Sequence, residues 1–183
     1  MAITESKFQQ NPPLKTPLKT QKIFLGVQIF MRTVTVAATL AATWLMVTNK
    51  QTSQIIGIEF DARYYYSPTF KFFAYANAVV SAFCLLSLFL VFLIHRNGSN
   101  PANYFILFLH DLVMLCLLMA GCSAATAIGY VGQYGNSHSG WAPICDHFGK
   151  FCKRGTDSVV LCYLSVVFLL MLTISSAAKS GKI

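Results

Sequence analysis

Four long stretches of the sequence are almost free of charged residues, and they restrict the fold more than any other feature. They cover about residues 23–47, 70–94, 104–130 and 158–178. A helix that rises 1.5 Å per residue needs about 20 residues to cross about 30 Å of hydrocarbon, and each stretch is long enough. A backbone in lipid must satisfy its own hydrogen bonds, so each stretch is predicted to be helical. The sequence therefore predicts an all-α membrane protein, a bundle of four transmembrane helices within residues 23–178.

The composition excludes two other classes of protein. Only 11% of the 183 residues are charged, which is too little polar surface for a soluble domain of this size. The 14 Lys and Arg residues exceed the 6 Asp and Glu residues, but they flank the apolar stretches. They form no basic patch interleaved with aromatic residues, so nucleic acid is not expected as a partner. The expected surrounding is the lipid bilayer.

The two ends of the chain are predicted to be tails on the same side of the membrane. Residues 1–22 are polar and basic, and prolines at 12, 13 and 17 argue against a regular helix, so a disordered cytosolic tail is predicted. Residues 179–183 form a second, short tail. Basic residues are denser before the first span than just after it, which places the N-terminus in the cytosol. Four spans then return the C-terminus to the cytosol, and a glycan on the Asn97 sequon would contradict this orientation.

The two segments that this orientation places outside the cell carry different signals. Apolar residues alternate at Ile56, Ile58 and Phe60, which predicts a short extracellular β element. The second outer segment contains Cys145 and Cys152, which are predicted to form a disulfide in an oxidising environment.

The second outer segment also offers an alternative chemistry and two exposed contact residues. A zinc site is the alternative to the disulfide, with His138 and His147 joining the two cysteines, but the C-x6-C spacing is not a usual zinc pattern. His138 and Trp141 are predicted to be contact residues of this loop. The four cysteines inside the spans are expected to be small packing residues; they are Cys84, Cys116, Cys122 and Cys162.

A positive and a negative charge lie inside the predicted spans at similar depth. Counted from the common side of the membrane, Arg32 is roughly 13 Å into the first span and Asp111 roughly 10 Å into the third. A charge at the centre of a helix costs about 2.5–3.5 kcal/mol, so each calls for a partner. We predict an Arg32–Asp111 ion pair that sets how the first and third helices pack. The alternative is a proton or ion relay that uses Asp111 with His110, although a transporter normally has more such groups.

Small residues recur at four-residue spacing in the third span. They are Gly121, Ala125 and Gly129, and such a stripe allows two helices to approach closely. Alanines of the first span are a candidate facing surface; they are Ala37, Ala38, Ala41 and Ala42. Spacing leaves open whether the stripe packs within one chain or between chains.

These features together resemble a known family. Arg32, Asp111 and the run "GYVGQYGNSHSGWAPICDHFGKFC" at residues 129–152 are similar to the pattern of the CASP-like (Casparian strip membrane domain protein-like) proteins of plants, within the wider MARVEL-type four-helix group. The resemblance implies a plasma-membrane protein that oligomerises with itself and with its relatives. The strip-forming members build immobile membrane platforms and recruit wall-modifying enzymes such as peroxidases. The first outer loop departs from theirs, because only "YYSPTFKFF" at residues 65–73 loosely resembles it.

The sequence contains no pattern typical of an enzyme. It has no G-x-S-x-G, no P-loop and no H-E-x-x-H, so no catalytic residue, cofactor or metal is predicted. The leading hypothesis is a non-enzymatic scaffold that forms homodimers or hetero-oligomers in the plasma membrane. A small transporter or channel subunit that uses Asp111 and His110 is the second hypothesis. A MARVEL-type trafficking or membrane-apposition protein is the third.

Overall fold

The fold is a four-helix bundle, as the apolar stretches predict. The computed structural model describes residues 18–55, 57–97 and 101–180. Its long helices are α1 (Leu18–Val47), α2 (Pro68–Asn97), α3 (Pro101–Tyr134) and α4 (Gly149–Ser180). All four are long and apolar enough to cross a membrane. The prediction of an all-α protein with four spans is confirmed.

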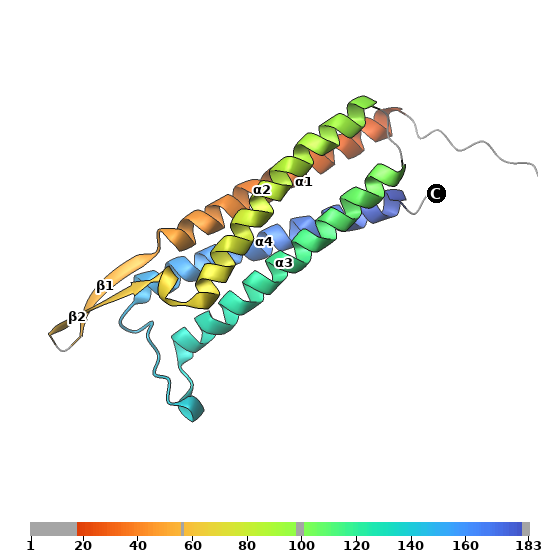
Figure 1. Ribbon diagram of the computed structural model, residues 1–183. Helices are drawn as coiled ribbons and strands as arrows, with labels where there is room; N and C mark the ends of the chain where they lie inside the picture. The colour runs from red at the N-terminus through yellow and green to blue at the C-terminus, as the bar shows by residue number, and fades with distance from the viewer. Residues whose placement is uncertain (1–17, 56, 98–100, 181–183) are drawn as a thin grey trace, which may run out of the picture.

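The helices run alternately up and down, and each packs against two others. α1 and α3 both pack against α2 and α4, so α1 and α3 lie on a diagonal of the bundle (Figure 1). Leu18 and Ser180 lie at one end of the bundle, which we call the terminal end. The opposite end carries the strands β1 and β2 and the loop 135–148, and we call it the hairpin end.

The helices extend beyond the predicted stretches, and two of the extensions correct the predicted tails. α1 begins at Leu18, so residues 18–22 are helical, whereas the sequence predicts a disordered tail there. A proline just before a helix is compatible with its first turn, where the missing N–H costs no hydrogen bond. Residues 1–17 of that predicted tail lie outside the described residues. α4 continues to Ser180, so it includes Lys179 from the second predicted tail, and residues 181–183 lie outside the description.

Contacts near the ends of α4 account for its length. Lys179 Nζ lies 4.2 Å from the ring centre of Phe24 and 4.6 Å from that of Tyr104, which joins α4 to α1 and α3 through cation–π contacts. At the other end, Phe148 and Phe151 are buried around the first turn. These anchors hold polar turns of α4 outside the apolar stretch 158–178.

The predicted extracellular β element is a two-stranded hairpin at the hairpin end. β1 (Lys50–Ile55) pairs antiparallel with β2 (Ile58–Arg63), with Lys50 opposite Arg63 and Ile55 opposite Ile58. Gly57 has φ +80° in the turn, a conformation that glycine adopts without strain. A short 3₁₀ turn at Tyr64–Tyr66 then leads into α2.

The hairpin is tied to the first turn of α4 by two long-range hydrogen bonds. Asn49 Nδ2 donates to the carbonyl oxygen of Phe151 at 2.8 Å, and the Phe151 N–H donates to Gln51 Oε1 at 2.7 Å. The start of β1 therefore has a fixed position relative to α4.

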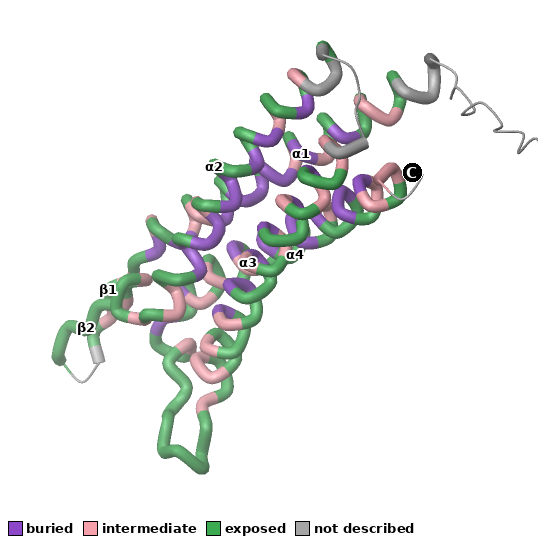
Figure 2. Tube along the Cα trace, turned by 45° about the vertical axis from the view of Figure 1, so that its right-hand side comes forward, coloured by how far each residue is buried: buried purple, intermediate pink, exposed green. Residues whose placement is uncertain are grey.

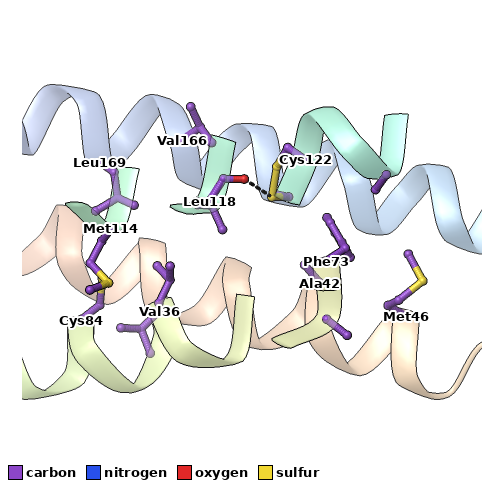
Figure 3. Packing of buried hydrophobic residues seen from close by; sticks show 14 of the residues in the cluster. Val36, Ala42, Met46, Phe73, Cys84, Met114, Leu118, Cys122, Val166 and Leu169 are labelled. Atoms are coloured by element: carbon purple, nitrogen blue, oxygen red, sulfur yellow. Dashed lines mark hydrogen bonds between the residues drawn. A yellow bond between two sulfur atoms is a disulfide. The ribbon is translucent and has the colours of Figure 1, made fainter. Parts of the chain in front are cut away.

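The core lies along the axis of the bundle. Buried residues occupy the inner faces of the helices, and exposed ones the outer faces (Figure 2). Side chains from all four helices meet in the interior, among them Val36, Cys84, Met114 and Leu169 (Figure 3). Large apolar side chains such as Phe89, which is 59% exposed, cover the outside. Such a surface suits contact with lipid.

Candidate functional site

The interior of the bundle contains a layer of charged side chains that is closed to solvent, and we call it the closed charged layer. Arg32 of α1 and Asp111 of α3 are both 0% exposed. Arg32 Nη1 donates to Asp111 Oδ1 at 2.8 Å, and Arg32 Nη2 donates to Asp111 Oδ2 at 2.6 Å. Two parallel N–H···O bonds between a guanidinium and a carboxylate are the strong, directional form of this interaction. The structure thus brings together the two charged residues that depth alone had matched.

A third helix joins the same layer through a serine. Arg32 Nη1 also donates to Ser87 Oγ of α2 at 2.7 Å, and Ser87 Oγ donates to the carbonyl oxygen of Cys84 at 2.9 Å. The guanidinium therefore connects α1, α2 and α3 at one depth. Sequence reasoning missed Ser87, because a serine inside a span usually bonds its own helix and gives no sign of a distant partner.

The position of the pair corrects the expected packing. Arg32 and Asp111 were expected to set how α1 and α3 pack together, but those helices are diagonal and have α2 and α4 as their neighbours. The long arginine side chain crosses the interior instead. The pair therefore joins two diagonally opposite helices, α1 and α3. The apolar contacts of both helices with α2 and α4 surround it.

Several polar atoms around this layer have no hydrogen-bond partner within the described part of the chain. They include Arg32 Nε and both amide atoms of Gln28, a side chain that is only 3% exposed. His110 Nδ1 lies 3.2 Å from Asp111 Oδ1, whereas His110 Nε2 has no partner among the described residues. Gln28 was overlooked in the sequence, although it lies one helical turn before Arg32 and hence on the same face.

Within the small-residue stripe of α3, Gly121 packs on α2. A Cβ added at Gly121 would lie 3.2 Å from Ala76 Cβ and 3.7 Å from Phe73 Cα, so Gly121 permits close approach of α2. Ala125 is buried, whereas Gly129 is exposed and a Cβ there would meet nothing within 4 Å.

The expected alanine surface on α1 does not face this stripe. Ala37 and Ala41 are exposed, and Ala38 and Ala42 are buried. The carbonyl oxygen of Ala42 accepts a hydrogen bond from Ser158 Oγ of α4 at 2.7 Å. The backbone at Ala42 therefore contributes to the contact of α1 with α4.

The loop at the hairpin end has a fixed shape and an exposed tip. Cys145 and Cys152 form a disulfide, with Cα atoms 5.7 Å apart, so the sulfurs that the zinc alternative needs are bonded to each other. His138 and Trp141 are both exposed near the tip, in a turn closed by hydrogen bonds between Asn136 and Trp141. Gly135 has φ +69°, and a Cβ there would lie 2.6 Å from the Trp141 carbonyl oxygen. Only glycine fits that position.

A second disulfide contradicts the packing role assigned to two intramembrane cysteines. Cys122 of α3 and Cys162 of α4 are bonded, with Cα atoms 6.3 Å apart. Cys84 is buried and free, and Cys116 is exposed and free. Sequence spacing could not show that Cys122 and Cys162 face each other, because they are 40 residues apart on different helices.

Comparison with known proteins gives a consistent set of relatives. The model of the Casparian strip membrane protein domain matches residues 22–168. "CASP-like protein 1F2" of Populus trichocarpa is 59% identical over 183 residues, covering 100% of this chain and 99% of the relative. "CASP-like protein 1F1" of Vitis vinifera is 54% identical over 183 residues, covering 100% and 87%. "CASP-like protein 1F1" of Arabidopsis thaliana is 38% identical over 171 residues, covering 93% and 96%. No solved structure matches the chain.

Proposed function

Because the chain belongs to the CASP-like family of multi-pass membrane proteins, we propose that it is a non-enzymatic scaffold of the plasma membrane. In this role it associates with copies of itself and with related CASP-like proteins to organise a membrane domain. The observation that carries the proposal is the closed charged layer. Asp111 accepts two hydrogen bonds from Arg32, so the one buried carboxylate among the described residues is engaged in holding helices together. A bundle braced in this way suits a structural role.

The hairpin end is the surface that we assign to other proteins. The β1–β2 hairpin and the loop 135–148 project from the helices at this end (Figure 1). Phe60, Tyr66 and Trp141 are exposed there, with Trp141 at 58%. Exposed aromatic side chains on rigid turns are typical anchors of protein interfaces. We propose that this surface recruits cell-wall-modifying enzymes.

The proposed orientation places both termini in the cytosol. Lysines precede the first span, and the loop disulfide between Cys145 and Cys152 suits an oxidising exterior. Reporter fusions at each terminus, read by protease protection in sealed vesicles, test it. A glycan on Asn97, which lies on the terminal side of the bundle, would contradict it.

Photobleaching of a fluorescently tagged chain in plant cells tests the scaffold. Slow recovery in stable plasma-membrane patches is expected, because each molecule is held by several neighbours. A matched tagged membrane protein of similar size that does not assemble should recover quickly. Fast, uniform recovery of the chain would contradict the proposal. Recycling through endosomes would instead support the MARVEL-type trafficking function.

One observation favours a transporter or channel subunit as the second candidate. His110 is partly exposed. Its Nδ1 lies 3.2 Å from Asp111 Oδ1, and its Nε2 has no hydrogen-bond partner in the described part of the chain. Asp111→Asn separates the two functions, because it removes the titratable group and keeps its shape. A variant that still assembles but loses a proton-dependent flux in liposomes would support transport and overturn the scaffold.

A further inference from the structure

A cavity lies between α3 and α4 at the hairpin end. It encloses about 400 Å³, within the range of about 300–1,000 Å³ of known ligand pockets. Its walls include Gly129 and Gly132 of α3, and Thr156 and Val160 of α4. The hollow is open beside Gly129, where an added Cβ would meet no atom within 4 Å, whereas a Cβ at Gly132 would lie 3.6 Å from Ile144. We call this cavity the α3–α4 groove.

The ends of the α3–α4 groove differ in character. Thr126 Oγ1 and Tyr163 Oη lie 3.1 Å apart and join α3 to α4 at the deep end. Ile144 and the Cys145–Cys152 disulfide line the groove at the hairpin end, where the N–H groups of Ile144 and Cys145 both donate to the carbonyl oxygen of Gly132. The groove is therefore closed along the bundle axis and opens sideways.

The sideways opening faces the region of the membrane. Tyr130 and Val160 line opposite walls and are 64% and 61% exposed. Both lie near the ends of the apolar stretches 104–130 and 158–178, so their exposed side chains are placed in the membrane near its surface. Tyr130 and Tyr134 have ring centres 4.7 Å apart, and tyrosines are enriched where hydrocarbon meets the headgroups. An occupant of the groove would therefore enter from the bilayer, near its surface.

Basic residues border the α4 side of the groove. The first nine residues of α4 contain Lys150, Lys153 and Arg154 against one acid, Asp157. Lys153 lies three residues before Thr156 and seven before Val160, so helical spacing places it on the same face as this wall. Its side chain is exposed. The groove thus combines an apolar body with a cationic edge at the depth of the membrane surface.

We propose that the α3–α4 groove binds one membrane phospholipid. An acyl chain fills the apolar hollow beside Gly129, and the phosphate lies against Lys153. A helix from a second copy suits the site less well. A spanning helix is about 10 Å wide and would have to continue past Ile144, whereas an acyl chain ends inside the groove. The proposal is independent of the scaffold function.

Photolabelling of the full-length chain in nanodiscs tests the tail of the lipid. The discs contain phosphatidylcholine with a small fraction of an analogue that carries a diazirine near the end of one acyl chain. Irradiation is expected to label residues 125–129 and 159–163, towards the deep end of the groove, more than other lipid-facing segments. Gly129→Leu fills the hollow and is expected to lower this labelling about tenfold, the effect of about two lost methylene contacts. Ala127→Leu, at an exposed position outside the groove, is the matched control and should label as the wild type does.

A second variant and a second readout allow the photolabelling to decide the question even if Gly129→Leu does not fold. Val160→Phe fills the groove from the opposite wall at an exposed position, and it should reproduce the loss if Gly129→Leu does not fold. Equal labelling of the wild type and of the groove variants that fold would overturn the proposal. Cross-links between two copies through groove residues, without lipid adducts, would overturn it in favour of a protein partner.

Competition with unlabelled lipid tests the phosphate. Replacing part of the host phosphatidylcholine by monogalactosyldiacylglycerol, which has acyl chains but no phosphate, should increase the labelling, because the galactolipid competes with the probe much less. Lys153→Gln is expected to lower the preference for phosphatidylcholine over the galactolipid about threefold, the size of an exposed charge contact. Lys71→Gln, at the start of α2 on the same end of the bundle, is the control. Equal competition by both lipids would overturn the assignment to a phospholipid.

Discussion

The buried pair Arg32–Asp111 and the exposed pair Arg63–Asp61 have the same nitrogen-to-oxygen distance, 2.6 Å. The side chains of the buried pair are 0% exposed, whereas Arg63 is 44% and Asp61 37% exposed. The buried pair joins residues 79 positions apart, and the exposed pair joins residues two positions apart within β2. The comparison teaches that the surroundings of an ion pair, and the segments that it connects, decide its effect on the fold.

The physical difference comes from water. At the hairpin end, solvent hydrates and screens Arg63 and Asp61, so their attraction adds little to stability. In the middle of the bundle, either charge alone would be costly, and the attraction between opposite charges is stronger because the dielectric is low. The buried guanidinium also uses both Nη atoms in a fork, whereas Arg63 bonds Asp61 through Nε alone.

The largest expected effect comes from removing one partner of the buried pair. Asp111→Ala should destabilise the bundle by about 3–5 kcal/mol, because Arg32 is left charged and unpaired inside it. Asp61→Ala is the matched control and should leave the stability unchanged. Thermal unfolding of the purified protein in nanodiscs, monitored by size-exclusion chromatography, measures the stability of both variants.

The exchanged pair distinguishes lost charge balance from lost packing. Arg32→Asp combined with Asp111→Arg should recover part of the stability lost in Asp111→Ala, since the pair can form again across the same diagonal. If Asp111→Ala melts at the wild-type temperature, the pair does not brace the bundle and the contrast between the two pairs fails.

The fold and the buried pair were largely predictable from the sequence. The apolar stretches predict four spans because hydrocarbon thickness fixes how long an apolar helix must be. Arg32 and Asp111 could be matched because depth in the membrane follows from residue count along a helix. Their diagonal placement could not be predicted, since depth says nothing about the order of helices around the bundle.

Features that depend on which faces of two helices lie against each other were not predictable from the sequence. The Cys122–Cys162 disulfide requires that two helices present particular faces to each other, which neither helix encodes alone. The same holds for Ser87, whose partner lies on another helix. β1, with the sequence "KQTSQI", lacks the alternation of a half-buried strand and forms as the pairing partner of β2. Gln51 contacts α4, but the polar residues of β1 show no apolar periodicity, so the sequence pattern carries no signal.

The next smaller effect tests the two parallel hydrogen bonds from the Arg32 guanidinium to the Asp111 carboxylate. Arg32→Lys keeps the positive charge but loses the paired Nη donors, so we expect a destabilisation of about 2–3 kcal/mol. Arg63→Lys should have no measurable effect, because that contact is single and hydrated. The same unfolding assay applies. Equal melting of Arg32→Lys and the wild type would show that charge alone matters at the buried pair.

The serine of the charged layer should contribute less. Ser87→Ala removes the hydrogen bond from Arg32 Nη1 to Ser87 Oγ and is expected to cost about 1–2 kcal/mol. Ser123→Ala is the control, because Ser123 is exposed and its hydroxyl bonds only the Met119 carbonyl oxygen of its own helix. If Ser87→Ala loses as much stability as Asp111→Ala, then Ser87 holds the Arg32 side chain in place and does more than accept one additional hydrogen bond.

The smallest effect is a pH dependence at the exposed pair. The hydrogen bond from Arg63, followed by that from the Tyr66 hydroxyl, holds the pKa of Asp61 below its ordinary value of 3.8. The hydrogen bond to Asp61 in turn raises the pKa of Tyr66 to about 12. A carboxyl whose pKa is lowered by folding stabilises the folded form fully above its ordinary pKa, and this contribution disappears as the pH falls through the lowered value.

Carboxyl-carbon NMR of labelled aspartate measures this titration directly. In the wild type, the Asp61 signal should titrate below pH 3.8. Arg63→Gln should raise the pKa of Asp61 towards 3.8, and Tyr66→Phe should raise it less, in the order of their contributions. An Asp61 pKa that is unchanged in Arg63→Gln would mean that the exposed pair does not persist in solution. The contrast with the buried pair would then be one between a stable interaction and none.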